Sequence, residues 1–576
     1  MGAADADIEV PVLVIGAGPA GMSTALVLGR LGTRCLLAER RAEVGTLPRA
    51  TGVRVRTMEL FRAWGIHEEI AGRAVPVRDG GEFTWVSTVA GERFGTTSLA
   101  RLEDPAARRA ATPMEVLFCP QDRVEPVLLA ELRTSPPVDV RFSSEVTSLR
   151  DDGDGVLAVV ENRVTGAVTR VRARYVVAAD GAASPTRAAL GIGLEGHDAR
   201  AEFVNIDFRA DLRPYVGDRP SVLYWVLNSR ASGTLAARDG RHRWYFGVLA
   251  GGATPADPAD PESCLRIVRD AIGVPGLPVE IEGARRWRMD AKVASSWRSG
   301  NVFLVGDAAH RFPPTGGFGL NSSIQDGHNL AWKLHWVHSG WAGEGLLNSY
   351  EAERRPIAEF NAAQSWRNMD LMAATGFTPD VHDFAAQLEA EAETGAGQQP
   401  LRERIRRGIP LQAPQFHALG QDIGFGYGDG SSAVVADGTA VPLGRDPEFE
   451  PSGAPGRRVP HHVLRRGGSE VSTLDLVEGR LTLFAARDAG AWTVAARAAA
   501  RSRQLPLHTQ RVAPTPDADL YDPTGDWEHH AGVGGTGAVL VRPDGHVAWR
   551  TSTPAGPHAE AELGDVLDTI LSRRPR

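Results

Sequence analysis

The sequence has little of the chemistry that marks several large classes of protein. Among its 576 residues there are three cysteines, Cys35, Cys119 and Cys264, and no CxxC pair. Three cysteines cannot build a disulfide framework. No cysteine or HExxH partner accompanies the adjacent histidines at positions 461–462 and 529–530, so we expect no metal site. No run of about 18 apolar residues occurs, and a membrane-spanning helix is therefore not expected.

Lysine is also scarce. Lys292 and Lys333 are the only lysines, and 71 acidic residues outnumber 63 basic ones, which gives a net charge of −8. A nucleic-acid-binding protein needs a concentrated cationic surface, so this balance argues against nucleic acid as a partner. The first seven residues include two aspartates and no basic residue, whereas a secretory signal begins with basic residues. We expect a cytoplasmic protein.

The composition is that of a globular protein. Hydrophobic residues make up 42% and charged residues 23% of the chain. At about 100–200 residues per domain, the length predicts three domains, with room for a large buried ligand.

The first 40 residues contain the clearest local pattern. Residues 10–15 predict a buried strand, residues 22–31 a helix and residues 34–38 a second strand. The loop between the first strand and the helix reads Gly-Ala-Gly-Pro-Ala-Gly. Its first glycine permits a tight turn, its second lets the backbone approach a pyrophosphate, and its third allows close packing of helix on strand. Glu39 ends the second strand and can accept hydrogen bonds from a ribose. This pattern predicts a site for FAD or NAD rather than NADP.

Further along, the sequence predicts more strands and a second sheet. Residues 140–177 indicate short strands that lead to Asp180-Gly181, and residues 203–250 alternate as in an antiparallel sheet with one solvated face. Residues 301–307 indicate a buried strand that ends at Asp307, and a long helix begins near Asn321. The Gly, Gln, Pro and Arg residues between about 391 and 414 predict a linker to a separate α/β domain.

Two segments favour FAD over NAD. One runs from Asp180 to Arg187 and the other from Gly306 to Asn321. In the second segment, a carboxylate at a strand end can hold a ribityl hydroxyl. The Pro/Gly-rich turn that follows leaves backbone N–H groups facing one edge of a flat ring. Such donors stabilise negative charge on a reduced isoalloxazine.

These motifs together resemble the class A flavoprotein aromatic hydroxylases, which have the p-hydroxybenzoate hydroxylase fold. The glycine loop, Asp180-Gly181 and Gly306-Asp307 occur in the family's order, and residues 48–61 and 119–128 are similar to two further family segments. This resemblance covers about residues 10–400. The tail, with residues 537–549, resembles the thioredoxin-like appendage of larger members. Among these, the chain looks most like the polyketide hydroxylases of actinomycete biosynthetic clusters.

The resemblance implies an α/β fold with three parts. An FAD-binding Rossmann-like domain would comprise residues 1–195 and 285–395, with part of 75–115 contributing to the substrate side. An inserted antiparallel-sheet substrate domain would comprise residues 196–284. After a linker at 396–414, residues 415–576 would form a thioredoxin-like domain without CxxC.

The resemblance also implies which residues bind the cofactor. Arg49 and Gln121 would contact the pyrophosphate or ribityl region, and Val146 would offer its backbone to adenine. Asp180 and Arg187 fit a motif tied to both FAD and NAD(P)H. This chain has Gly317-Phe318-Gly319 where the family often has Gly-Gln-Gly, although larger members also carry Phe. The implied cofactor-binding set is Gly16, Gly18, Pro19, Ala20, Gly21, Glu39, Arg40, Arg49, Gln121, Val146, Asp180, Arg187, Asp307, Pro314, Gly317, Gly319, Leu320 and Asn321.

The family mechanism supplies the implied reaction. NADPH or NADH reduces FAD, O₂ then forms a flavin C4a-hydroperoxide, and an electron-rich phenol attacks its distal oxygen. The substrate would be a large, polycyclic aromatic polyketide. Pro314 would line the oxygen-transfer site. Tyr224 would hydrogen-bond a phenolic oxygen, or else only pack within the sheet.

Several alternatives stay open from the sequence. Trp225, Trp244 and Trp287 line an aromatic pocket or fill the core, and His310 is expected to be structural. A Baeyer–Villiger or epoxidising flavin monooxygenase uses the same fold, as does a geranylgeranyl-reductase-like enzyme. A non-catalytic flavin-binding protein is a further alternative. The sequence does not distinguish a monomer from a homo-oligomer.

Overall fold

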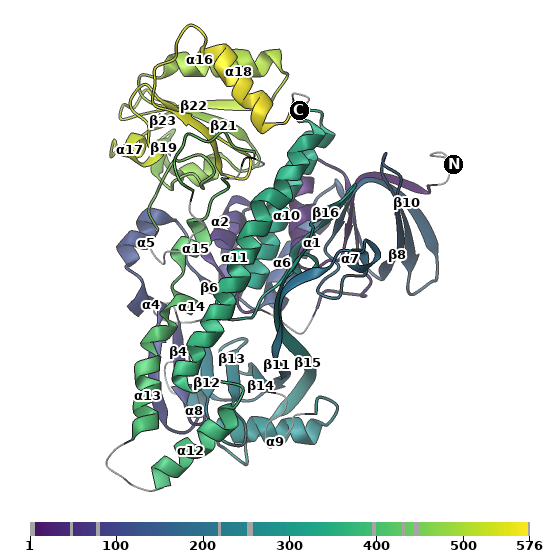
Figure 1. The fold of residues 1–576 in the computed structure, drawn as a ribbon, viewed down its shortest axis with the longest axis vertical. Helices are drawn as coiled ribbons and strands as arrows, with labels where there is room; N and C mark the ends of the chain where they lie inside the picture. Colours follow the sequence, from purple (N-terminus) through teal and green to yellow (C-terminus); the bar gives the residue numbers. More distant parts are fainter. Residues whose placement is uncertain are drawn as a thin grey trace.

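The computed structural model describes residues 6–45, 50–76, 81–216, 221–249, 257–393, 399–428, 430, 433–441 and 449–573. Three large sheets organise this part of the chain (Figure 1). No helix in these ranges is long and apolar enough to cross a membrane.

The first sheet contains the predicted strand–helix–strand unit. Its strands run in the order β16-β17-β10-β1-β2-β7, and β8 and β9 extend it beside β10. The pairs of β1 with β10 and β2, of β2 with β7 and of β10 with β17 are parallel, so these strands end at one edge. The bounds are β1 (Ile8–Ile15), α1 (Pro19–Arg30), β2 (Cys35–Ala38), β7 (Val138–Arg141), β8 (Ser144–Asp151), β9 (Val156–Asn162), β10 (Val168–Ala178), β16 (Arg298–Ser299) and β17 (Val302–Leu304).

Buried helices pack against the first sheet. Helix α10 (Phe318–His338) lies against α1, and α6 (Gln121–Arg133) lies on the other side of α1. Helix α11 (Ser349–Met372) is long enough to reach from the C-terminal domain to the second sheet (Figure 1). The predicted helix near Asn321 corresponds to α10, which begins three residues earlier.

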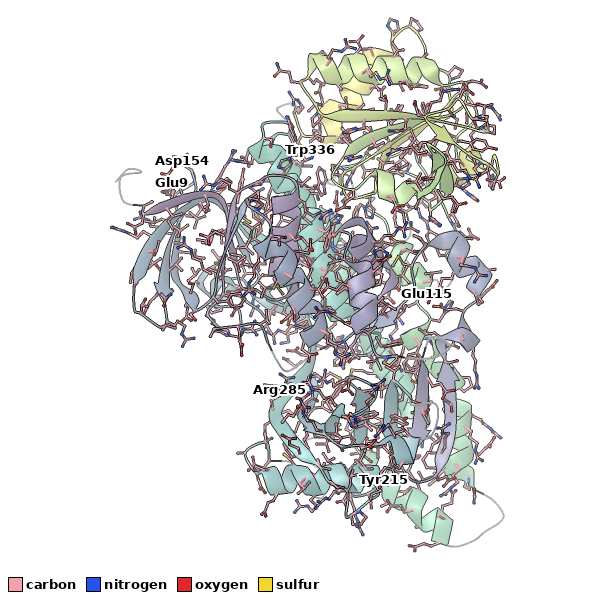
Figure 2. The ribbon with its side chains drawn as sticks, turned by 180° about the vertical axis from the view of Figure 1, so that it is seen from behind. Glu9, Glu115, Asp154, Tyr215, Arg285 and Trp336 are labelled. Atoms are coloured by element: carbon pink, nitrogen blue, oxygen red, sulfur yellow. The ribbon has the colours of Figure 1, made fainter. Side chains whose placement is uncertain are left out.

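The second sheet is mostly antiparallel, as residues 203–250 predict. Its order is β18-β15-β11-β14-β13-β12-β4-β5, and only β12 and β4 pair in parallel. The long strands β11 and β15 connect it to the first sheet, and Figure 2 shows Arg285 near this junction. The bounds are β4 (Glu82–Val86), β5 (Arg93–Ser98), β11 (Leu194–Arg209), β12 (Leu223–Val226), β13 (Gly233–Ala237), β14 (Arg243–Leu249), β15 (Glu280–Ala294) and β18 (His310–Arg311).

The linker predicted at 396–414 is wrong for the part that the structure describes. Helix α13 (Pro400–Gly408) and α14 (Ala413–Phe416) lie there, and Ile405, Ile409 and Phe416 are buried in the core of the second sheet. The guanidinium of Arg402 donates to Glu92 and Glu391. The polar composition hid an apolar face, with Ile405 and Ile409 one helical turn apart. Residues 394–398 lie outside the described ranges.

The C-terminal sheet has the expected thioredoxin-like arrangement. Strands β21, β22, β24 and β25 lie in the order β22-β21-β24-β25, with β22 parallel to β21 and the other two pairs antiparallel. The crossover helix α16 lies beside α18. The bounds are β19 (Val463–Arg466), β20 (Ser469–Ser472), β21 (Leu481–Ala485), α16 (Gly490–Ser502), β22 (Leu507–Ala513), β23 (Leu520–Tyr521), α17 (Trp527–Ala531), β24 (Ala538–Val541), β25 (Val547–Thr551) and α18 (Ala559–Ile570).

Shorter elements complete the described chain. They are β3 (Gly52–Val53), α2 (Val55–Ala63), α3 (His67–Arg73), α4 (Leu99–Leu102), α5 (Pro105–Ala111), β6 (Leu117–Phe118), α7 (Pro185–Ala189), α8 (Arg213–Val216), α9 (Pro261–Ile272), α12 (Val381–Glu393) and α15 (Leu419–Ile423), with 3-10 turns at Gly306–Ala308, Glu344–Asn348, Ala373–Thr375, Pro410–Gln412 and Thr473–Leu476.

Candidate active site

A cavity of about 1100 Å³ lies between the edge of the first sheet and one face of the second. Glu39, Asp180 and Asp307 line it from the first sheet, whereas Tyr245 and Trp287 line it from the second. Sites for a single small ligand span about 300–1,000 Å³. The cavity is slightly larger than this range, so it has room for more than a single small ligand.

The glycine loop has the geometry that a dinucleotide needs. Gly16 has a φ of +100°, and a Cβ there would lie 2.4 Å from the carbonyl oxygen of Ala179. A Cβ on Gly21 would lie 1.9 Å from the carbonyl oxygen of Gly16, so both positions require glycine. Gly18 faces open space, and helix α1 begins there without a side-chain cap. Its first N–H groups are thus available to an anion such as a pyrophosphate, next to the cavity-lining Pro19 and Ala20.

Glu39 is held in its ionised form at the end of β2. One carboxylate oxygen accepts a 2.8 Å hydrogen bond from the Ala17 N–H, and the other accepts from the backbone and side chain of Arg41 at 2.9 Å. Burial acts to raise the pKa of Glu39, but these hydrogen bonds hold it below its ordinary value. The Arg41 guanidinium also donates to the first oxygen at 3.3 Å, which brings the carboxylate to about its four acceptor positions. A ribose hydroxyl would therefore compete with this longest contact. Sequence reasoning named the neighbouring Arg40, which lines the cavity, and missed Arg41.

Gln121 and Val146 line the same half of the cavity. The Gln121 amide donates a 2.6 Å hydrogen bond to Glu125, whose other oxygen accepts from the Gly45 N–H. Val146 lies at an irregularity of the β8–β9 pairing, which leaves its backbone beside the cavity. Arg49, predicted to belong here, lies outside the described residues.

The Asp180-Gly181 segment divides into a lining part and a supporting part. Asp180 lines the cavity, and its carboxylate accepts from the Ser184 hydroxyl and from the Thr186 N–H at 3.0 Å. Arg187 is buried and is not on the cavity wall. Its guanidinium donates to the carbonyl oxygens of Ala308 at 2.9 Å and Ala182 at 3.1 Å. Arg187 thus ties this segment to the Gly306–Ala308 turn.

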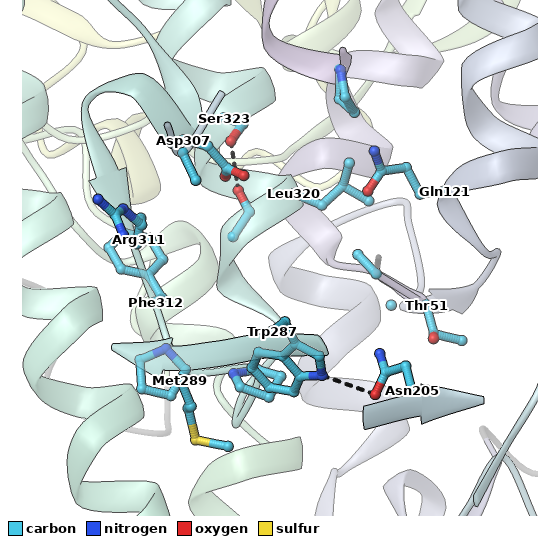
Figure 3. Close-up of a pocket in the computed structure, with 18 of the residues that line it drawn as sticks. Thr51, Gln121, Asn205, Trp287, Met289, Asp307, Arg311, Phe312, Leu320 and Ser323 are labelled. Carbon is cyan, nitrogen blue, oxygen red and sulfur yellow. Dashed lines mark hydrogen bonds between the residues drawn. The ribbon is translucent and has the colours of Figure 1, made fainter. Parts of the chain in front are cut away.

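The segment after β17 forms the centre of the cavity wall. Asp307, Pro314, Gly317, Gly319 and Leu320 all line it, and Figure 3 shows Asp307 and Leu320 on the side opposite Trp287.

Asn321 has a different place. Its amide donates to the carbonyl oxygens of Gly317 at 2.7 Å and Gly52 at 3.1 Å, and it accepts from the Arg54 N–H at 2.9 Å. Asn321 therefore holds the backbone at Gly317 in place without lining the cavity itself. Arg54, which sequence reasoning missed, also donates to the Gly316 carbonyl at 2.8 Å.

The second half of the cavity has an aromatic wall. Strand register places Phe203 beside Trp287, and their rings stack at 5.0 Å. Trp225 also lines the cavity, and Phe83 stacks on Phe416 at 3.8 Å. Of the three tryptophans with two open interpretations, Trp225 and Trp287 line the cavity, whereas Trp244 is buried in the core. Flat rings with few polar atoms suit a flat aromatic ligand.

Three uncharged polar residues interrupt this wall, in addition to the charged residues of β15 and β18 that line the cavity, Arg285, Arg286, Arg288, Asp290 and Arg311. Asn205 and Thr234 stand on either side of Gly247 in register, and a Cβ on Gly247 would lie 3.0 and 3.1 Å from their oxygen atoms. The missing side chain leaves a notch between two hydrogen-bonding groups. The Asn205 oxygen accepts a 2.9 Å hydrogen bond from Trp287, which fixes the amide orientation (Figure 3).

Tyr245 is the third polar residue. The buried Arg238 guanidinium lies 4.4 Å from the centre of its ring and donates to Asp207 at 2.9 Å. Burial raises the pKa of Tyr245, although the charge of Arg238 acts in the opposite direction.

The predicted substrate contact of Tyr224 is wrong. Leu223 and Trp225 line the cavity, and strand alternation directs Tyr224 to the other face. Its hydroxyl accepts a 2.8 Å hydrogen bond from the Ser221 N–H within the core. The alternative interpretation, a sheet-packing aromatic, is correct. Tyr245 is the tyrosine that the sheet presents to the cavity.

The histidines singled out by the sequence lie elsewhere. His310 is buried, and its Nε2 lies 2.6 Å from Asp326, as expected for a structural residue. His462 and His530 come from the two adjacent pairs and lie within 3.2 Å of each other, and His462 also contacts Asp522. Among the described residues, no group of three or more potential ligands could hold a metal ion.

Family comparisons agree with this geometry. A family model described as an FAD binding domain matches residues 9–365, and one described as the C-terminal region of aromatic-ring hydroxylases matches residues 452–574. The chain belongs to the FAD-dependent aromatic-ring hydroxylases. The resemblance stated from the sequence is thus confirmed, together with the fold class and the assignment as an FAD-dependent monooxygenase.

Individual relatives cover nearly the whole chain. It is 38% identical to a putative polyketide hydroxylase of Streptomyces coelicolor, over 98% of this chain and 97% of the relative. It is 36% identical to the tetracenomycin B2 monooxygenase-dioxygenase of Streptomyces olivaceus, over 98% and 99%. The solved structure of the flavin-dependent monooxygenase PieE with FAD and substrate has a TM-score of 0.89 and 34% identity, and covers 99% of this chain and 100% of that one. Aklavinone-11 hydroxylase with FAD and aklavinone has a TM-score of 0.82 and 34% identity, over 98% and 100%.

Proposed function

We propose that this enzyme hydroxylates a flat, polycyclic aromatic polyketide, using O₂ and NADPH or NADH. The observation that carries the proposal is the shared cavity of about 1100 Å³, which has a dinucleotide half and an aromatic half. Relatives of similar length are named for polyketide, tetracenomycin and aklavinone oxidation, which supports this substrate class.

We assign the cofactor half to FAD residue by residue. The start of α1, at Gly18, Pro19 and Ala20, would hold the pyrophosphate, Glu39 the adenosine ribose and the Val146 backbone the adenine. Gln121 and Asp307 would contact the ribityl region, and the loop from Pro314 to Leu320 would face the ring. Asn321, Gly21 and Arg187 would position these groups from behind. The role of Arg49 rests on the family resemblance alone.

FAD, when bound, accepts electrons from the nicotinamide and activates oxygen. The residues of this chain hold the substrate beside it. Trp225, Trp287 and Phe203 would hold the rings of the substrate, and Pro314 would line the boundary between the two halves of the cavity. The Tyr245 hydroxyl, with Asn205 and Thr234, would hydrogen-bond substrate oxygens and orient the ring carbon that is hydroxylated. The apolar wall would exclude water from the reaction.

The domain limits are part of the proposal. Residues 1–195 and 285–395 would form the FAD-binding domain, residues 196–284 the substrate sheet, and the chain from about 415 the thioredoxin-like domain. The burial of Ile405 and Ile409 beside the second sheet supports adding residues 400–414 to the substrate side.

The purified yellow protein tests the function. We expect tricyclic or tetracyclic hydroxylated polyketides to accelerate NADPH oxidation and to yield products with one added oxygen. A Baeyer–Villiger enzyme gives the same mass, so the product is also treated with mild base. A phenol survives this treatment, whereas a ring-expanded lactone opens. Oxidation without any oxygenated product, or a lactone product, would contradict the proposal.

A further inference from the structure

A buried group of charged side chains joins the FAD-binding domain to the C-terminal domain. Lys333 and Asn329 come from α10, and Glu353 and Arg354 come from α11. Arg542 and Asp544 come from the turn between β24 and β25. Each of these side chains is almost fully buried. Figure 2 shows Trp336 of α10 near the C-terminal domain.

The C-terminal domain contributes the central cation. Arg542 makes a two-pronged contact with Glu353, at 2.6 Å and 2.8 Å, and also donates to Asp544. The Glu353 carboxylate accepts from Lys333 as well, at 2.7 Å. Removing one partner of a buried ion pair leaves an uncompensated charge in a low dielectric, so Glu353 and Arg542 constrain each other strongly.

The next residue on α11 continues the contacts toward the flavin site. Arg354 donates a 2.9 Å hydrogen bond to one oxygen of Asp326. The other oxygen of Asp326 accepts from the Gly306 N–H at 3.3 Å and lies 2.6 Å from His310. Gly306 directly precedes Asp307, which lines the cavity.

The His310 ring adds a second contact with the cavity wall. It stacks on Phe312 at 4.5 Å with an angle of 2° between the rings, and Phe312 lines the cavity. Asp326 thus supports both the backbone before Asp307 and one aromatic side of the cavity.

We propose that Arg542 of the C-terminal domain is a positioning residue for the turn at Gly306-Asp307, an inference that rests on the assignment of Asp307 to FAD in the proposed function. Glu353 and Arg354 are neighbours on one rigid helix, so the contact that fixes Glu353 also fixes the guanidinium that holds Asp326. The C-terminal domain then does more than cover the FAD-binding domain. It sets the position of the Gly306-Asp307 turn, which binds the cofactor in the proposed function.

FAD binding by the full-length chain tests this inference without any substrate. The dissociation constant is measured by titrating apoprotein with FAD and following flavin fluorescence. We expect Arg542→Met to raise it about tenfold, since coupling through a packed network is typically worth a factor of a few to several tens. Asp326→Asn should do the same, and Asp307→Ala serves as a positive control for a lost cofactor contact.

The matched control is Arg503→Met. Arg503 forms a two-pronged ion pair with Asp568 inside the C-terminal domain, at 2.9 Å for each contact, and does not reach the FAD-binding domain. We expect its FAD dissociation constant to stay within about twofold of the wild-type value. An equal rise of the FAD dissociation constant in both variants would overturn the proposal, because general loosening of the C-terminal domain, and not the contacts from Arg542 to Asp326, would then weaken FAD binding.

A double-mutant cycle separates coupling from two independent effects. The cycle combines Arg542→Met with Asp326→Asn. If Arg542 acts through Asp326, this double variant should bind FAD about as weakly as the single variant with the lower affinity. The proposal would be overturned if the rise in the FAD dissociation constant of the double variant equalled the product of the two single rises. A folded Arg542→Met variant with wild-type FAD affinity and flavin spectrum would overturn it as well. If Arg542→Met does not fold, Arg542→Lys replaces it, because it keeps the charge and loses the two-pronged contact. An unchanged dissociation constant in that variant would overturn the proposal equally.

Discussion

At the scale of single residues, the proposed function assigns the orientation of the substrate to the Tyr245 hydroxyl. Its ring lies against the buried Arg238, which Asp207 holds in place. The buried ion pair restrains one side of the ring of this cavity-lining residue. This preorganisation suits a group that must orient a substrate oxygen.

Two tyrosine variants distinguish this role from packing. Tyr245→Phe should lower kcat/KM about two- to tenfold, which corresponds to the roughly 0.5–1.5 kcal/mol of one hydrogen bond, with unchanged FAD content. Tyr224→Phe should leave kcat/KM nearly unchanged and lower the melting temperature, because it loses the hydrogen bond from Ser221. Steady-state kinetics and thermal unfolding measure both effects. The reverse pattern would restore the assignment of Tyr224 to the substrate.

His546 gives a pH dependence of stability. Burial, together with the guanidinium groups of Arg56 and Arg542, lowers its pKa from 6.5 to about 4, although Asp544 acts in the opposite direction. Between pH 6.5 and about 4 the unfolded chain therefore binds a proton that the folded chain does not, and stability falls with falling pH.

His546→Phe should remove part of this acid sensitivity. The free energy of unfolding should lose about 3 kcal/mol less between pH 7 and pH 4 than in the wild type, from a shift of about 2.5 pKa units. His335 and His461, whose pKa values are also lowered to about 4, keep part of the acid sensitivity in the variant. Denaturant unfolding across this range measures the slope. Identical slopes in both proteins would contradict the account.

At the scale of elements, the sequence predicts backbone-determined features well. The β1–α1–β2 unit follows from glycine geometry and buried strand composition, and both are local properties. The face of the sheet on which a strand side chain lies is harder to predict, because a shift of one residue in register moves every side chain of the strand to the opposite face. Tyr224 and its neighbour Trp225 therefore could not be assigned from alternation alone. The segment at 396–414 was misjudged because Ile405 is buried only by contact with a distant sheet.

The notch at Gly247 allows a test of whether the cavity-lining face of the second sheet binds the substrate. Gly247→Val would place methyl groups between Asn205 and Thr234. Even the Cβ of such a side chain would lie only 3.0–3.1 Å from their side-chain oxygens. We expect unchanged FAD affinity and a substrate dissociation constant raised about tenfold or more, because the polar notch is filled. Isothermal titration with FAD and with substrate gives the two values. Weakened FAD binding with normal substrate binding would place the substrate elsewhere.

At the scale of the whole molecule, the cavity is assembled from distant parts of the chain. Gly16 and Phe416 both line it, and neither can be placed beside the other from sequence spacing. Glycines also line it at two places, Gly45 and Gly52 at one and Gly316, Gly317 and Gly319 at the other, and we propose that the loops at these places act as hinges. Such loops commonly set turnover in enzymes that close over a reaction.

This arrangement predicts that substrate gates the flavin. Bound substrate should accelerate anaerobic reduction of the flavin by NADPH at least about tenfold, a change of about 1.4 kcal/mol in the barrier. Without such gating, NADPH would reduce the oxidised flavin even when no substrate is bound. O₂ would then reoxidise the flavin, with loss of both electrons to hydrogen peroxide. Stopped-flow absorbance at the oxidised-flavin band, with and without substrate, measures both rates. Equal rates would remove the gating role of the two loops.

The most direct test of the central claim follows the oxygen atom itself. The enzyme, NADPH and a polycyclic hydroxylated polyketide are incubated under ¹⁸O₂ in ordinary water, and the product is examined by mass spectrometry and NMR. The account predicts one labelled oxygen, carried as a new hydroxyl on an aromatic ring carbon. A product with unlabelled oxygen, or NADPH consumption that yields only labelled hydrogen peroxide, would contradict it.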